Sequence, residues 1–120
     1  MKPLDILYVV ISTALLVVNQ IALKLWLINK KVTVWPINLN FFKSLFSLEI
    51  IISIVSIGLS GVLWLSLLKK IEFSVLYPMI SLSYVFGVLA AIFIFKESVP
   101  IIRWMGIVVI IFGIFLITRN

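Results

Sequence analysis

Four long apolar stretches constrain the fold of this chain more than any other feature. They cover about residues 4–28, 46–68, 73–95 and 99–118, and the runs 50–68 and 73–95 contain no charged residue. A helix needs about 20 mostly apolar residues to cross a hydrocarbon core of about 30 Å, and a single span in lipid must satisfy its own backbone groups. Arg103, in the first turn of the last stretch, can snorkel to the interface. The sequence therefore predicts an all-α membrane protein, one domain over residues 1–120 with four transmembrane helices.

The composition excludes several classes of function. Hydrophobic residues make up 64% of the chain and charged residues 12%, which excludes an ordinary soluble domain. Cysteine and histidine are both absent, so we expect no metal site, no cofactor and no catalytic residues. The net charge of +6 is not gathered into any basic cluster longer than two residues, which disfavours nucleic-acid binding. The first apolar stretch is too long for a signal sequence, and we expect it to remain in the mature protein.

The distribution of basic residues does not choose an orientation in the membrane. Four basic residues lie on the side that holds both termini and the 69–72 turn, and five on the other side. Either copies insert in both orientations and pair antiparallel, or a partner subunit fixes the topology, or other factors set one orientation. The long connection over residues 29–43 carries Lys30, Lys31, Trp35 and Pro36, and we expect it to lie along the membrane interface.

Small residues recur on single faces of three predicted helices. Such stripes let helix backbones approach closely in lipid, where no hydrophobic force drives association. Each stripe is either a packing seam within the chain or a seam between subunits, and we expect some of them to face a second subunit. The stripes are Ser53, Ser56 and Ser60 in the second span, Ser83, Gly87 and Ala91 in the third, and Gly106 and Gly113 in the fourth.

The first span carries polar side chains well inside its apolar stretch. Asn19, Gln20 and Lys24 lie there, and the i, i+4 spacing places Gln20 and Lys24 on one face, with Thr13 two turns earlier. Polar groups at such positions are candidates for a substrate site. An ammonium group would attract an anionic headgroup while amides supply hydrogen bonds. The alternative is that Lys24 snorkels to the nearby interface.

The chain from Gly61 to Thr118 resembles the second half of small-multidrug-resistance-like proteins of the drug/metabolite transporter (EamA-like) superfamily. It is most similar to the ArnE type, a subunit of the flippase for aminoarabinose-phosphoundecaprenol. The first helix is similar more loosely, through Asn19-Gln20 and Lys24. The matching residues of the second half are Val62-Leu63-Trp64-Leu65, Tyr77-Pro78, Ser81-Leu82-Ser83-Tyr84, Glu97, Trp104, Gly106 and Gly113.

The chain departs from the drug-exporting relatives at one position. Those proteins carry a membrane-embedded glutamate two turns before the lysine, and this chain has Leu16 there. Leucine cannot exchange protons, which weakens proton-coupled antiport and favours an anionic lipid-linked substrate for Lys24.

Other motif residues have structural interpretations, and for some of them a substrate-site role stays open as well. Tyr77 and Tyr84, with Ser81 between them, either form part of a cavity wall that binds substrate or pack against neighbouring helices. Trp64 is either a substrate-site residue or an interfacial anchor. Pro78 is expected in the first turn or two of its helix, where the missing N–H costs little. Glu97 is expected to stabilise the N-terminus of the last helix.

The resemblance implies a non-enzymatic function as a transporter or flippase subunit. The implied substrate is a polyprenyl-phosphate-linked sugar of the undecaprenyl-phosphate aminosugar type, and the implied location is the bacterial inner membrane. Four helices alone enclose no transport path, so we expect a homodimer, antiparallel if both orientations occur, or a heterodimer with a homologous four-helix subunit. The alternatives are a small-multidrug-resistance-type antiporter of small cations and an accessory subunit without its own transport path.

Overall fold

The computed structural model describes residues 2–31 and 38–119, so Trp35 and Pro36 of the expected interfacial connection lie outside the described residues. It contains four helices long and apolar enough to cross a membrane. They are α1 (Pro3–Asn29), α3 (Leu48–Lys70), the continuous stretch Phe73–Phe93, and α6 (Ile101–Thr118). A short helix, α2 (Leu39–Ser44), precedes α3. The prediction of an all-α, multi-pass membrane protein with four spans is confirmed.

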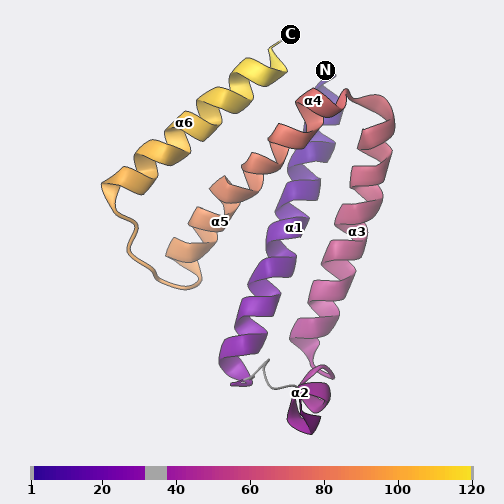
Figure 1. The fold of residues 1–120 in the computed structure, drawn as a ribbon, viewed down its shortest axis with the longest axis vertical. Coiled ribbons are helices and arrows are strands. Elements are labelled where there is room, and N and C mark those ends of the chain that lie inside the picture. The colour runs from indigo at the N-terminus through magenta and orange to yellow at the C-terminus, as the bar shows by residue number, and fades with distance from the viewer. Residues whose placement is uncertain (1, 32–37, 120) are drawn as a thin grey trace.

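The helix ends and the connections between them lie toward two opposite ends of the molecule. The start of α1, the end of α6 and the turn after Lys70 lie at one end of the molecule, and the 94–100 loop is much nearer the other (Figure 1). At that other end, Trp26 of α1 donates a 2.7 Å hydrogen bond from Nε1 to the carbonyl of Ser44 and contacts the ring of Phe41 edge-on, at 6.0 Å between centroids. These contacts attach α2 to the end of α1.

Helices α1 and α3 lie side by side and form the best-packed part of the chain (Figure 1). Near the start of α1 they share a small apolar core with the beginning of the third span. Its fully buried members are Val9, Leu67, Leu76 and Met79. This core fixes the turn between α3 and the third span, because all three segments contribute a side chain to it.

A line of buried hydroxyl groups joins α1 to α3 further along. Ser60 Oγ donates to the carbonyl of Ser12 at 2.9 Å, and Ser12 Oγ donates to the carbonyl of Ser60 at 3.2 Å. Closer to the other end, Ser53 Oγ donates to Asn19 Oδ1. Ser56, between them on the same face of α3, is also buried. The serine stripe of the second span is thus a seam within the chain, because its partners belong to α1.

We expect Ser60→Leu to lower the free energy of unfolding in mixed micelles by about 1–3 kcal/mol, since leucine removes the hydrogen bonds between Ser60 and Ser12 and crowds the buried contact between α1 and α3. Ser60→Ala should cost only about 0.6 kcal/mol, the mean for an interhelical hydrogen bond in a membrane protein. Ser66→Leu is the matched control, because Ser66 is exposed and bonds to the carbonyl of Val62 in its own helix. Equal losses for Ser60→Leu and Ser66→Leu would contradict the seam.

The third span changes its winding at Pro78. It begins as α4 (Phe73–Leu76), tightens into the 3-10 segment η1 (Tyr77–Ser81), and continues as α5 (Leu82–Phe93). Proline lacks an N–H and its ring crowds the preceding turn, so a regular α-helix cannot pass through it without adjustment. Pro78 lies in the second turn after Phe73, and the 3-10 winding is the local adjustment.

Helix α6 packs mainly on α5 and η1, and it leans away from α1 and α3 (Figure 1). Most of its large apolar side chains are exposed, and Ile107 is its one buried residue among those described. Gly106 is exposed and Gly113 half-buried, and a Cβ added at either would meet nothing within 4 Å. Neither glycine is therefore required for a close helix approach within the chain.

Candidate functional site

One face of α1 lines two hollows in the membrane-spanning region. Thr13, Leu16, Gln20 and Lys24 recur at three- or four-residue spacing, so they form a continuous stripe along the helix. Thr13 and Leu16 line the first hollow, and Gln20 and Lys24 line the second. The shared face inferred from the i, i+4 spacing is therefore also the face that the chain leaves open.

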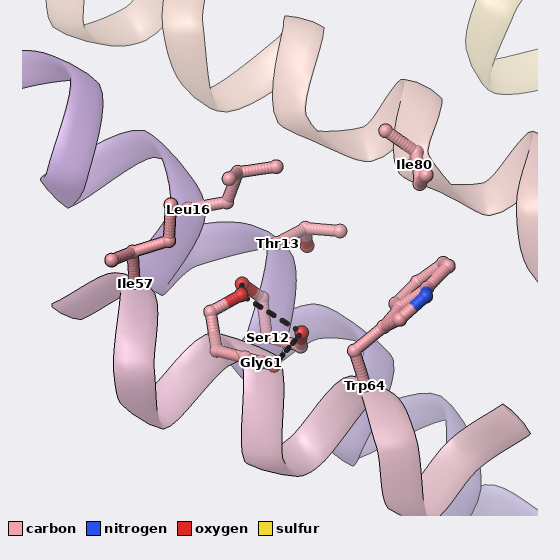
Figure 2. Close-up of a pocket in the computed structure, with 8 residues that line it drawn as sticks. Ser12, Thr13, Leu16, Ile57, Gly61, Trp64 and Ile80 are labelled. Carbon is pink, nitrogen blue, oxygen red and sulfur yellow. Dashed lines mark hydrogen bonds between the residues drawn. The ribbon is translucent and has the colours of Figure 1, made fainter.

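The first hollow, called here the apolar hollow, lies between α1, α3 and Ile80 of η1 and has a volume of about 220 Å³ (Figure 2). Figure 2 shows Leu16 and Ile57 on one side of it, and Trp64 and Ile80 on the other. The remaining lining residues are Ser12, Thr13, Ser60 and Gly61.

The hydroxyl groups at the apolar hollow are already bonded within the protein. Thr13 Oγ1 donates to the carbonyl of Val9 at 2.9 Å, while Ser12 and Ser60 bond to each other across the seam. Leu16, at the position of the glutamate in drug-exporting relatives, presents only methyl groups. This hollow therefore offers apolar surface, with no charge to bind or release a proton.

The second hollow, called here the charged hollow, lies between α1 and α5 and has a volume of about 250 Å³. It contains an amide, an ammonium group and a carboxylate on otherwise small or apolar walls. Its lining residues are Val17, Gln20, Ile21 and Lys24 of α1, Gly87, Ala90 and Ala91 of α5, and Phe95 and Glu97 beyond the end of α5.

An ion pair lies in the lining of the charged hollow. Lys24 Nζ lies 2.9 Å from Glu97 Oε1 and 4.4 Å from the centre of the Phe95 ring. The two charged side chains are 49% and 45% exposed. The ammonium and carboxylate groups therefore remain about half exposed while they are paired, so a ligand can still reach both of them.

A left-handed turn after α5 places Glu97 at the hollow. Lys96 has φ of 53°, and the N–H of Glu97 donates to the carbonyl of Ala91 at 2.8 Å. A residue with positive φ commonly follows the last turn of a helix, and here it turns the chain back so that Glu97 bonds to the end of α5. Glycine is the usual residue at such a position, so a lysine there accepts some backbone strain.

The prediction that Glu97 stabilises the N-terminus of the last helix is wrong. Helix α6 begins at Ile101 after Pro100, and no side chain caps it. Glu97 lies four residues earlier and pairs with Lys24, since the turn at Lys96 directs it back toward α1. Sequence spacing carries little signal for this pair, because 73 residues separate its members.

The other predicted substrate-site residues are dispersed by the fold. Asn19 is buried against α3, where it accepts from Ser53, and its Nδ2 has no hydrogen-bond partner among the described residues. Tyr77 and Tyr84 are exposed and line neither hollow, and Tyr77 stacks on Phe73 at 5.1 Å. Half-buried Ser81 lines neither hollow. Only Gln20 and Lys24 share the charged hollow, while Trp64 lines the apolar one.

Two small residues of the predicted seam in the third span lie beside a hollow of this chain. Gly87 and Ala91 line the charged hollow opposite Gln20 and Lys24, while Ser83 is half-buried one turn earlier. A Cβ added at Gly87 would meet nothing within 4 Å. Within one chain, Gly87 therefore leaves space beside α1.

Comparison with curated proteins gives matches to proteins named as ArnE-type flippase subunits. The chain is 43% identical over 67 residues to a protein of Yersinia pseudotuberculosis serotype O:1b named as a probable 4-amino-4-deoxy-L-arabinose-phosphoundecaprenol flippase subunit ArnE. It is 42% identical over 67 residues to the protein of that name in Yersinia pestis, and 38% over 69 residues to that in Pseudomonas fluorescens. The resemblance to ArnE-type flippase subunits is confirmed.

These matches cover part of each protein. The 67-residue alignments take in 56% of this chain and 59% of the Yersinia ArnE proteins, and the Pseudomonas alignment takes in 58% and 60%. The chain thus matches about three fifths of the length of its ArnE-type relatives. No family model matches the chain. No solved structure matches it either.

Proposed function

We propose that this chain is a subunit of a flippase in the bacterial inner membrane, a transporter rather than an enzyme. Its substrate would be a polyprenyl-phosphate-linked sugar of the undecaprenyl-phosphate aminosugar type. The observation that carries the proposal is the charged hollow, which presents Lys24 and Gln20 between two membrane-spanning helices. The similarity to ArnE-type subunits is the basis for the substrate class that we propose for this hollow.

The chemistry of a lipid-linked sugar explains why a small polar hollow is enough. The polyprenyl tail can stay in the bilayer throughout, so only the phosphate and sugar need shelter. Moving an unpaired polar group into hydrocarbon costs several kcal/mol, and a charged group costs more. A hollow that supplies one ammonium group and one amide replaces part of the headgroup's hydration.

The working unit would contain at least two subunits. Each hollow is formed mainly by two helices and is open at its side, and α6 contributes to neither. A homodimer, antiparallel if both orientations occur, or a heterodimer with a homologous four-helix subunit would turn two such half-sites into one path. Seams for this contact are proposed along Ser83 and along Gly106 and Gly113, and a Cβ added at either glycine would meet nothing within 4 Å in this chain.

Proton-coupled export of small cations has less support. The position that would hold the exchanging carboxylate is Leu16, in a hollow with no charged lining residue. The carboxylate at the other hollow, Glu97, is neutralised by Lys24 at 2.9 Å. A cation would have to displace that lysine before it could bind.

Reconstitution into liposomes tests the proposal. The full chain, purified with any subunit that remains bound, should move an undecaprenyl-phosphate aminosugar from one leaflet to the other without a proton gradient. A parallel assay should show no gradient-driven uptake of a quaternary ammonium drug. Drug movement without lipid movement would replace the proposal with antiport, and movement of neither would leave an accessory subunit.

A further inference from the structure

The charged hollow contains an ion pair, although a single positive charge would be enough to bind an anionic headgroup. Lys24 comes from within a membrane-spanning helix, and Glu97 is brought to it by the turn at Lys96. Both side chains are about half exposed, and Phe95 supports the ammonium group from one side. A lysine meant only for phosphate would bind it better without a carboxylate already in contact.

The headgroups that such an ion pair favours are those whose binding leaves no charge without a partner. A headgroup with only a phosphate must separate Lys24 from Glu97, which leaves the carboxylate facing a hollow without a counter-charge. A small cation that binds Glu97 likewise leaves Lys24 without a counter-charge. A headgroup that carries both a phosphate and a protonated amine exchanges one ion pair for two, and no charge is left unpaired.

We infer that Glu97 is a specificity-determining residue that binds a cationic amino group on the sugar while Lys24 binds the phosphate. The charged hollow then selects lipid-linked headgroups that carry both charges and discriminates against those whose sugar is neutral. Gln20, on the same wall as Lys24, offers a hydrogen bond to the sugar between the two charges. The inference rests on the proposed function and assigns its substrate selectivity to this ion pair.

Two polyprenyl-phosphate sugars that differ by one group test the inference, one with an amine and one with a hydroxyl at the same carbon. In liposomes, the unaltered chain should move the amino lipid about tenfold faster, the ratio expected for one charge-assisted hydrogen bond. Glu97→Gln should bring the two rates to within about twofold, mainly by slowing the amino lipid. Glu97→Asp, which keeps the carboxylate, should restore part of the preference.

Glu49→Gln is the matched control, because Glu49 lies in the first turn of α3 and lines neither hollow. It should leave the preference unchanged. Equal slowing of both lipids by Glu97→Gln, together with lower thermal stability, would show that the ion pair only fastens the 94–100 loop to α1. Equal rates for the two lipids in the unaltered chain would also overturn the inference, yet leave the flippase proposal intact. Failure to move either lipid would instead remove the flippase proposal, and this inference with it.

Discussion

Lys24→Ala is expected to slow transport of the lipid-linked sugar by about 100-fold, while the protein remains inserted and folded. The expected loss corresponds to about 3 kcal/mol, the upper value for a hydrogen bond to a charged group. The variant removes the ammonium group that the described residues place at the charged hollow, and it leaves Glu97 to repel the phosphate. Rates measured in liposomes at equal amounts of inserted protein check this result.

Two further variants separate substrate binding from general charge effects. Lys24→Arg keeps the positive charge but changes the donor geometry, so its rate should lie between those of the unaltered chain and the alanine variant. Lys30→Ala removes a positive charge near the same end of α1 from an exposed residue outside both hollows, and it should have little effect. Full transport by Lys24→Ala would show that this lysine only snorkels to the interface.

Gly87→Leu is expected to reduce transport by more than about tenfold without loss of stability. A Cβ at Gly87 meets nothing within 4 Å, and the added carbon atoms extend into the charged hollow opposite Gln20 and Lys24. Leucine is also the better helix former by about 0.8 kcal/mol. Thermal unfolding in detergent should therefore show an unchanged or slightly higher midpoint, while liposome assays show the loss.

The size of the substituent and its position both matter to this result. Gly87→Ala, which adds one carbon to open space, should keep most of the transport rate. Gly58→Leu makes the same change on α3, where a Cβ also meets nothing within 4 Å and the residue lines neither hollow. It should transport normally. If Gly87→Leu matched Gly58→Leu in rate, the headgroup would not pass through the charged hollow.

The sequence alone determined the four spans and the polar stripe of α1. In lipid, a single span pairs its backbone N–H and C=O groups by forming a helix, so length and hydropathy are enough to predict one. Within α1, the 3.6-residue period alone places Gln20 and Lys24 on one face. These inferences use interactions between residues a few positions apart, which sequence spacing describes directly.

The tertiary structure decided which faces meet. Asn19 and Gln20 are neighbours in sequence, yet Asn19 is buried against Ser53 of α3 and Gln20 lines the charged hollow, because their side chains point about 100° apart around α1. The Lys24–Glu97 pair joins residues 73 positions apart through a left-handed turn at Lys96 that hydropathy does not signal. Tyr77 and Tyr84 both point outward and are exposed, because the contacts that hold the third span to α1 use other side chains. Helix periodicity fixes which side chains lie together on one helix, and only packing between helices fixes what they contact.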